Sequence, residues 1–584
     1  MDRQEFYSGR SMDAWKYMGA HREDSGVRFV TYAPGASRVA LIGTFNDWNE
    51  TEMVRTDGAG FYEAYVDNAQ VGDMYKYRIY GAGGRVMDHA DPYGFGMEKR
   101  PASASLIRDM SAYTFHDAAW MAARTDCQDA PLNIYEMHMG SWKKPGEAAD
   151  DWYTYREIGE KLVPYLKAYG FSHVELMPIL EHPFDGSWGY QNTGFFAPTS
   201  RYGTATDLKA MVDHLHANGI GVILDYVPVH FAVDDYGLKL YDGTALYEYP
   251  AAEVGESEWG SLNFIHSRPE VESFLLSCAD YWLSEYHFDG LRMDAVSRLI
   301  YWQGDENRGV NGGAIAFLKM MNGRLKEKYP SVMLIAEDST SYSGTTRPVG
   351  AGGLGFDYKW DMGWMHDTLS VFQTAPENRR DVYHKLTFSM MYYYNEQHLL
   401  PLSHDENVHG KATILQKMHG GYEEKFQEGK VLYLYMMMHP GKKLLFMGSE
   451  FGQLREWDEK REQDFDLLKY ETHRDFSEFM KRLGNIYLTC DALWHDYDRD
   501  NFFWEDCHKE EDCVYVIRRR GTKEDLVMFM NLGEKSVTYT LPIPGEEGRC
   551  LISTEKEYKK SPVAEEITAE LKPQSAQLYK LKRS

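Results

Sequence analysis

The sequence contains few cysteines and no long hydrophobic run. Its six cysteines are scattered over 584 residues, and no two of them form a CxxC pair. This spacing favours reduced thiols over a disulfide framework or a zinc site. No apolar run reaches the roughly 18 residues that a membrane-spanning helix needs, and the first residues, Met1 to Glu5, lack the charged-then-apolar pattern of a secretory signal. We therefore expect a cytoplasmic protein with no membrane partner.

Positive charge is also scarce. The chain has 63 Lys and Arg residues against 89 Asp and Glu residues, which gives a formal net charge of −26. Because such a charge repels phosphate backbones, we expect no nucleic-acid partner, whereas a neutral substrate is compatible with it. Aromatic residues are abundant instead, at 14% of the chain. Their rings suit either stacking on sugar faces or the filling of a core.

The spacing of apolar runs divides the chain into three parts. Residues 26–80 alternate short apolar runs with turns, which predicts a small β-sandwich. From Pro131 onward, strand-like runs alternate with amphipathic segments of helical length, which predicts βα units and a parallel sheet. After about residue 486 the pattern returns to short strands and predicts an all-β domain. We expect domain extents of 1–120, 121–485 and 486–584, with a second β-sandwich in the last.

Eight candidate strands in the middle part indicate a closed (β/α)8 TIM barrel, an α/β fold. They cover residues 132–140, 172–180, 219–227, 290–296, 332–338, 355–360, 400–405 and 443–451. Before one of the helices, Ser267-Arg268-Pro269-Glu270 forms a capping-box pattern. Gly350-x-Gly352-x-x-Gly355 matches the dinucleotide fingerprint by letter, yet no strand precedes it and no helical pattern follows, so we expect a loop.

Four of these candidate strands end in ionisable residues. The segments are 222–230, 288–296, 332–338 and 400–406, and catalytic groups of such barrels lie at the C-terminal ends of strands. Arg292 and Asp294 are two positions apart, so on a strand they point to the same side and the guanidinium can hold the carboxylate ionised. The apolar run before Glu337 predicts a drier setting and a raised pKa, which suits proton donation. A salt bridge at a strand end is the simpler interpretation of any single carboxylate.

In their order along the chain, the four segments resemble the signature regions of the α-amylase clan, family 13 of the glycoside hydrolases. Along nearly its whole length the chain further resembles the bacterial 1,4-α-glucan branching enzymes of that clan. The supporting stretches are 134–142, 187–194, 358–367 and 445–453. Residues 43–49, Gly-Thr-Phe-Asn-Asp-Trp-Asn, are similar to the family 48 carbohydrate-binding module that precedes the barrel in these enzymes.

The resemblance implies a role for each of several residues. Asp294 would be the nucleophile, Glu337 the general acid/base, and Asp405 a third carboxylate that grips sugar hydroxyls and stabilises the transition state. The subsite of the cleaved glucose would be lined by Tyr190, Asp225, His230, Arg292 and His404. The implied activity is glycogen branching: retaining cleavage of an α-1,4 bond and transfer of the chain to a glucan 6-hydroxyl. α-Glucan would be both donor and acceptor, and the protein would act as a monomer.

Two alternatives remain open. An α-glucan hydrolase of the same clan, of amylase or debranching type, would share the four regions, and a non-catalytic glycogen-binding protein would share the N-terminal module. The intact trio Asp294, Glu337 and Asp405 argues against the binding protein. Only the flanking stretches favour transfer over hydrolysis.

Some positions depart from the family pattern. Asp338 stands where branching enzymes commonly have Glu, and Asn407 where a branched apolar residue is usual, which bears on substrate preference. Related amylases commonly place an Asn calcium ligand at the position of Val229, which offers no side-chain oxygen to a hard cation. We therefore expect no metal and no cofactor.

Four tryptophans have two interpretations each. Trp48 fits either a sugar-stacking platform of the N-terminal module or a local core position. An enzyme that transfers a sugar chain needs a groove for the acceptor, and Trp360, Trp364 and Trp457 are candidate walls of it. Ordinary core packing is the alternative for each of the three.

Overall fold

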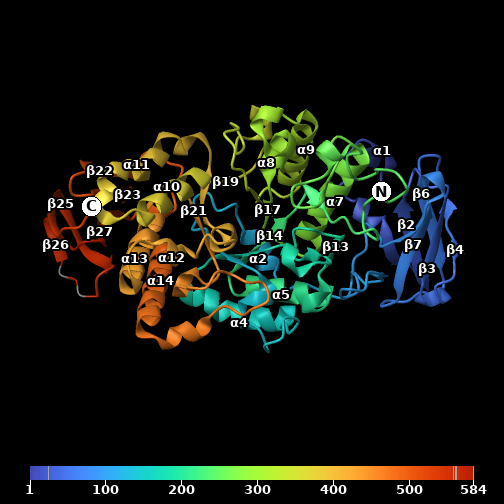
Figure 1. The fold of residues 1–584 in the computed structure, drawn as a ribbon, viewed down its shortest axis with the longest axis horizontal. Coiled ribbons are helices and arrows are strands. Elements are labelled where there is room, and N and C mark those ends of the chain that lie inside the picture. Colours follow the sequence, from blue (N-terminus) through green and yellow to red (C-terminus); the bar gives the residue numbers. More distant parts are fainter. Residues whose placement is uncertain (24, 557, 559–561, 583–584) are drawn as a thin grey trace.

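A computed structural model describes residues 1–23, 25–556, 558 and 562–582. The molecule is elongated, with a β module at the N-terminal end, a barrel in the middle and a second β region at the C-terminal end (Figure 1). No helix within the described residues combines the length and the apolar character needed to cross a membrane.

The N-terminal module consists of two antiparallel sheets. One has the strand order β1-β2-β6-β5 and the other β4-β3-β7-β8, with β9 also paired to β7. The strands are β1 (Gly19–Glu23), β2 (Gly26–Tyr32), β3 (Arg38–Gly43), β4 (Thr51–Glu52), β5 (Val54–Arg55), β6 (Phe61–Val66), β7 (Met74–Tyr80), β8 (Val86–His89) and β9 (Ser105–Leu106). Alternate residues of β7 are buried, and its Tyr75 ring lies 5.0 Å from the Phe29 ring of the other sheet. The predicted β-sandwich is confirmed.

Trp48 lies on the surface of this module. It is 40% exposed and has a left-handed backbone with φ of 59°, directly after the turn η2 (Thr44–Asn46). This exposure favours the platform over the core position. Trp48→Ala is therefore expected to weaken glycogen binding roughly three- to tenfold, since aromatic stacking contributes about 0.5–1.5 kcal/mol, and to leave the melting temperature unchanged.

Affinity electrophoresis in glycogen would measure this loss. Val54→Ala is the matched control, because Val54 is 65% exposed on the same module but has no ring. Equal glycogen binding by Trp48→Ala and the wild type would assign glucan recognition to another surface.

The middle of the chain forms a closed parallel barrel of eight strands, as predicted. In order they are β10 (Asn133–Met137), β11 (His173–Leu176), β14 (Gly221–Tyr226), β17 (Gly290–Met293), β18 (Met333–Ala336), β19 (Tyr358–Trp360), β20 (His398–Leu402) and β21 (Lys442–Phe446). The barrel closes where β10 pairs with β21, with Ile134 opposite Leu444. All residues of these strands are buried, because helices cover the outside and side chains fill the inside.

Helices surround the barrel (Figure 1). The long ones are α4 (Tyr155–Tyr169), α5 (Ala205–Ala217), α7 (Pro269–Glu285), α9 (Gly312–Lys328), α10 (Met362–Gln373), α13 (Tyr422–Met438) and α14 (Glu471–Thr489), and the short ones are α2 (Ala118–Ala123), α3 (Met139–Trp142), α6 (Ala252–Gly255), α8 (Val296–Ile300), α11 (Lys385–Phe388) and α12 (Ile414–Lys417). The predicted capping box before α7 is wrong. Its N-cap is Arg268 and makes no side-chain cap bond, because a guanidinium has no acceptor atom for the N–H groups of the first turn.

Between β18 and β19 the chain crosses without an α-helix. Residues 337–357 form a loop with one short 3₁₀ turn, η8 (Val349–Ala351). The Gly350-x-Gly352-x-x-Gly355 pattern lies in this loop, as predicted. Two excursions also extend the rim at the C-terminal ends of the barrel strands, the hairpin β12 (Leu180–Glu181) with β13 (Gly194–Pro198) and the pair β15 (His230–Phe231) with β16 (Leu262–Asn263).

The C-terminal region is a single antiparallel sheet with the order β22-β23-β24-β27-β25-β26. Its strands are β22 (Phe502–Lys509), β23 (Val514–Arg520), β24 (Glu524–Asn531), β25 (Val537–Ser553), β26 (Pro562–Leu571) and β27 (Ser575–Lys582). All-β structure was predicted correctly, and the six strands are hydrogen-bonded into one continuous sheet. The reason is the long β25, which pairs with both β26 and β27 and has a register shift after Ile543.

The first residues of the chain join the N-terminal module to the barrel. Helix α1 (Arg3–Tyr7) and the turn η1 (Ala14–Lys16) lie against α7 (Figure 1). The Trp15 N–H donates to Ser277 Oγ at 2.9 Å, and its indole N–H donates to Asp280 at 3.1 Å. One cluster of buried apolar side chains extends from Phe6 through the module and the barrel to Leu578 of β27.

Candidate active site

The four acidic segments meet at the C-terminal rim of the barrel, around a cavity of about 690 Å³. Six of the predicted site residues line this cavity: Tyr190, His230, Asp294, Glu337, His404 and Asp405. The other two, Asp225 and Arg292, are almost fully buried, at 0% and 1% exposed. They do not line the cavity themselves but contact residues that do. The structure therefore brings all eight predicted residues together.

The guanidinium of Arg292 ties the site together. Its Nη1 donates to both carboxylate oxygens of Asp225, at 2.9 and 3.0 Å, and to Asp294 Oδ1 at 2.8 Å. Its Nη2 lies 3.9 Å from Glu337 Oε2, and the group stacks over the Trp360 ring at 4.5 Å. The sequence predicted the pairing with Asp294. The second and stronger partner, Asp225, extends from the neighbouring strand β14, where it lies opposite Arg292.

The turn after β17 places Asp294 next to Glu337. Ala295 has a left-handed backbone with φ of 46°, an unusual conformation for a residue with a Cβ. It directs the Ala295 N–H at Glu337 Oε2, 2.7 Å away. Backbone hydrogen bonds between Glu337 and Met293 and Val296 tie the two strand ends together. The two carboxyl groups therefore occupy neighbouring positions that the backbone fixes.

Their environments separate the two acids chemically. Burial raises the pKa of Glu337 to about 7, and the negative charges of Asp294 and Asp405 act in the same direction, against the opposing charge of Arg292. Asp294 instead accepts a direct hydrogen bond from the Arg292 guanidinium. A carboxylate paired with a guanidinium, beside a carboxylic acid that keeps its proton near neutral pH, is the arrangement of a nucleophile and a general acid.

His404 is positively charged in this site. Its backbone N–H and its Nδ1 both contact the carboxylate of Glu136, at 2.8 and 2.5 Å. Burial alone would lower its pKa, but Asp405 and Glu136 raise it to about 9. Burial likewise opposes ionisation of Asp405, and the charges of His404 and Arg292 outweigh it and lower the pKa of this carboxyl. Glu136 was not among the predicted site residues.

Tyr190 and His230 complete the wall around the buried end of the cavity. The Tyr190 hydroxyl donates to Asp225 Oδ2 at 2.6 Å, and its ring stacks on that of His404 with 5.7 Å between centroids. Burial lowers the pKa of His230 to about 4, so this ring is neutral. A flat aromatic face, a neutral imidazole and three carboxyl groups suit a polyhydroxylated substrate such as a sugar.

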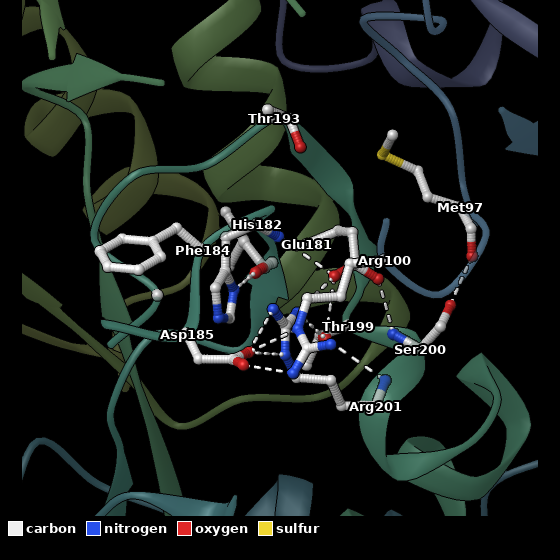
Figure 2. Close-up of polar contacts among 12 residues, drawn as sticks. Met97, Arg100, Glu181, His182, Phe184, Asp185, Thr193, Thr199, Ser200 and Arg201 are labelled. Carbon is white, nitrogen blue, oxygen red and sulfur yellow. Dashed lines mark hydrogen bonds and ion pairs between the residues drawn. The ribbon is translucent and has the colours of Figure 1, made fainter. Parts of the chain in front are cut away.

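The loop that carries Phe184 and Trp188 into the cavity is held by ion pairs (Figure 2). Asp185 lies between the guanidinium groups of Arg100 and Arg201, with Arg201 Nε at 2.9 Å. Burial opposes its ionisation, yet the two guanidinium groups lower its pKa to about 2. Arg201 also donates to the buried Glu181 at 2.8 Å. This wall of the cavity is therefore rigid.

The two departures from the family pattern lie outside the cavity lining. Asp338 is buried and pairs with Lys359 at 2.9 Å. Asn407 is buried, and its side-chain amide bonds to the backbone. The amide nitrogen donates to Ser403 O at 2.8 Å, and the amide oxygen accepts from the Ile414 N–H at 3.2 Å. Both side chains stabilise loops of the rim and do not contact the space that a substrate would occupy.

The three candidate groove tryptophans are core residues. Trp360 and Trp364 are each 1% exposed, and Trp457 is 6% exposed. The large exposed aromatic side chains of the cavity are Phe184 and Trp259, at 63% and 46%, and neither was predicted from the sequence. A signal was available for Trp259, because it is the one apolar residue in the polar run Gly255-Glu256-Ser257-Glu258-Trp259-Gly260-Ser261.

The fold and the site together define a class: a barrel enzyme of the α-amylase type with its acids at the C-terminal rim. The family model "Alpha amylase, catalytic domain" matches residues 147–238 and 258–516, and "Carbohydrate-binding module 48 (Isoamylase N-terminal domain)" matches residues 17–94. Within this class, similarity to curated relatives identifies the family. The chain belongs to the family of 1,4-alpha-glucan branching enzymes.

Two of these relatives share the name "1,4-alpha-glucan branching enzyme GlgB". That of Geobacillus stearothermophilus is 43% identical over 542 residues, which cover 91% of this chain and 84% of that protein. That of Fusobacterium nucleatum subsp. nucleatum is 43% identical over 567 residues, which cover 96% and 92%. A solved pullulanase complexed with maltotetraose from Anoxybacillus sp. LM18-11 shares the fold, with a TM-score of 0.76 at 18% identity and coverage of 97% and 87%.

Proposed function

We propose that the chain cleaves an α-1,4-glucosidic bond of glycogen or amylose and transfers the released chain to a glucan 6-hydroxyl, so that α-glucan is both donor and acceptor. The observation that carries the proposal is the pair Asp294 and Glu337, one carboxyl hydrogen-bonded to Arg292 and the other with a pKa raised to about 7. The names of the curated relatives support branching as the outcome.

In the first step, Asp294 would attack the anomeric carbon while Glu337 gives its proton to the oxygen of the departing chain. Asp405 and His404 would hold the hydroxyls of the cleaved glucose, and Tyr190 would stack on its ring. Arg292 would hold the Asp294 carboxylate in place until it forms the ester. The product of this step is a glycosyl-enzyme with inverted anomeric configuration, and the second displacement restores the original configuration.

In the second step, Glu337 would act as a base for the incoming hydroxyl. Water and a glucan 6-hydroxyl compete for this step, and water is far more concentrated. Transfer prevails only when the protein binds the acceptor so that its hydroxyl has a high effective molarity, which in oriented reactions reaches roughly 10⁵ M or more. The proposed function therefore requires an acceptor site beside Glu337.

We assign the three parts of the chain to separate tasks. Residues 1–120 would recognise glucan away from the catalytic cavity, residues 121–485 would carry out the reaction, and residues 486–584 would support the barrel. The match of the carbohydrate-binding module to residues 17–94 supports the first assignment, and the position of the cavity supports the second.

The test is to incubate the purified protein with amylose and to follow iodine absorbance and reducing ends together. Branching lowers the iodine absorbance while reducing ends stay nearly constant, and a debranching enzyme then releases new chains from the product. If reducing ends rise in step with the loss of iodine absorbance, the protein is a hydrolase and the proposed function is wrong.

Chelation of divalent metals is expected to leave this activity unchanged. Val229 is buried and offers no oxygen ligand, and no group of three or more His, Cys, Asp or Glu side chains within the described residues is placed to hold a metal ion. Activity would be measured after dialysis against a chelator and again after calcium is added. Loss in the chelator with recovery in calcium would contradict the prediction.

A further inference from the structure

Phe184 and Trp259 expose their rings at the catalytic cavity from two different loops. Phe184 comes from the loop between β12 and β13, and Trp259 from the loop between α6 and β16. Exposed aromatic rings at the mouth of a polar cavity are suited to stacking on sugar rings. The two rings are therefore separate candidate platforms for a bound glucan.

Trp259 is held in a fixed orientation before any substrate binds. The guanidinium of Arg298 lies 4.2 Å from the centre of its ring and is itself bonded to Glu258 at 2.6 Å and to Gln303 at 2.7 Å. The backbone of Trp259 is also tied down, because its carbonyl accepts a hydrogen bond of 2.8 Å from Gln191 Nε2. One face of the ring is therefore backed by a cation, and the His230 ring adjoins it with 5.3 Å between ring centres. A sugar would stack on the part of the ring that stays exposed, with little further ordering cost.

The wall that contains Trp259 continues directly from the two reacting acids. Arg298 lies in α8, which begins right after Asp294 and Ala295, and Ser339 lines the same cavity two residues after Glu337. The opposite wall is formed around His404 and Asp405, where Trp188 stacks on His409 with 5.2 Å between ring centres.

A general acid protonates the oxygen of the departing chain, so the departing chain lies on the side of that acid. In the second step the acceptor enters the space that the departing chain has left, because the same group then deprotonates the incoming hydroxyl. The wall of Trp259 and Arg298 is therefore the acceptor wall. Phe184, on the loop with Trp188, belongs to the wall that holds the donor.

We propose that Trp259, backed by Arg298, is the stacking platform of the acceptor subsite and determines how often a glucan chain, and not water, takes the glycosyl group from Asp294. The proposal rests on the proposed function, since it presumes that a glycosyl-enzyme is partitioned between these two acceptors. The bond that forms joins the anomeric carbon to the acceptor oxygen, the ester to Asp294 breaks, and the proton of the hydroxyl passes to Glu337.

The test measures the ratio of branches formed to reducing ends released from amylose. Trp259→Ala and Trp259→Leu are expected to lower this ratio roughly three- to tenfold, because both remove the ring face and stacking contributes about 0.5–1.5 kcal/mol. Trp259→Phe and Trp259→Tyr should keep most of it. Raising the glucan concentration should restore branching by Trp259→Ala, since a weakened acceptor site fills by mass action.

Phe184→Ala is the matched control. It removes a ring that is more exposed than that of Trp259, at 63% against 46%, from the same cavity but from the donor wall. We therefore expect it to raise the KM for amylose and leave the ratio unchanged. Because both products come from one glycosyl-enzyme, the ratio does not depend on how much of a variant is folded. An unchanged ratio in Trp259→Ala and Trp259→Leu would overturn the proposal, as would the same loss of ratio in Phe184→Ala.

The wild-type result separates this proposal from the proposed function. If the wild type releases reducing ends in step with its loss of iodine absorbance, the branching function fails, whatever Trp259 does. If the wild type branches and the Trp259 variants branch equally well, the function stands and the acceptor platform is elsewhere.

Discussion

Asp294→Asn is expected to lower kcat by roughly 10⁴-fold or more, the scale seen when a nucleophile is removed from an enzyme that depends on it. The amide has nearly the same shape as the carboxylate, so packing around Arg292 is retained, but it cannot form the glycosyl ester. The affinity for glucan should change little, because Tyr190, Asp405 and His404 still line the site. Branching rates on amylose and glycogen affinity would be measured on the same preparation.

The matched control for this variant is Glu253→Gln. Like Asp294→Asn, this change replaces a carboxylate by an amide. Glu253 lies in the rim excursion between β14 and β17, its side chain is 84% exposed, and its partner, Arg308, lies 3.4 Å away in another loop. Near wild-type turnover is expected from it. If Asp294→Asn also retained wild-type turnover, the nucleophile would be a different residue.

Glu337→Gln is expected to lower the branching rate by 10²- to 10⁴-fold, the usual contribution of a general acid and base. The glutamine cannot give a proton to the departing chain. A glycosyl fluoride needs no such proton, so formation of the glycosyl-enzyme from it should be much less affected. Equal losses on amylose and on the fluoride would indicate that Glu337 does not act as the acid.

The pH dependence follows from the same group. Because Glu337 must be protonated for the first step and its pKa is about 7, the rate of glycosyl-enzyme formation is expected to fall as pH rises through 7. The variant Glu337→Gln should lack this decline when it acts on the fluoride. A wild-type rate that stays level to pH 9 would contradict the assignment.

The raised pKa also predicts an effect on stability. A carboxyl with a folded pKa of about 7, above its ordinary 4.5, stabilises the fold below the ordinary pKa and loses that contribution as pH rises through 7. Glu337→Gln should therefore melt at a higher temperature than the wild type above pH 7, and the difference should disappear near pH 4. Thermal melts at the two pH values would check this.

The barrel could be predicted from the sequence because its strands are buried on both sides. Runs such as Val222-Ile223-Leu224 and Leu334-Ile335-Ala336 are apolar without alternation, which is the pattern of a parallel sheet under helices. The pairing of Arg292 with Asp294 followed from their spacing of two on one strand. In both cases the information is local.

Contacts between distant segments could not be predicted in the same way. Glu136 binds His404 from 268 positions away, and nothing in the sequence joins them, although a carboxylate inside the apolar run of β10 needs a buried partner. The sequence makes Trp360 and Trp364 candidates for a groove wall only because they are aromatic. Their burial depends on which way a short strand and a helix face, and the sequence leaves this open.

The buried cluster from Phe6 to Leu578 is expected to couple the unfolding of the N-terminal module to that of the barrel, whereas the C-terminal sheet also has a cluster of its own. Domains of a chain this long commonly unfold in separate steps, but here α1 and η1 cover a face of α7, so the barrel shares buried surface with the residues that precede the module. A fragment that begins after residue 94, where the match to the carbohydrate-binding module ends, would expose that face to water. The family matches thus divide the N-terminal module from the barrel, whereas in unfolding by heat or cleavage by proteases we expect the two to respond together.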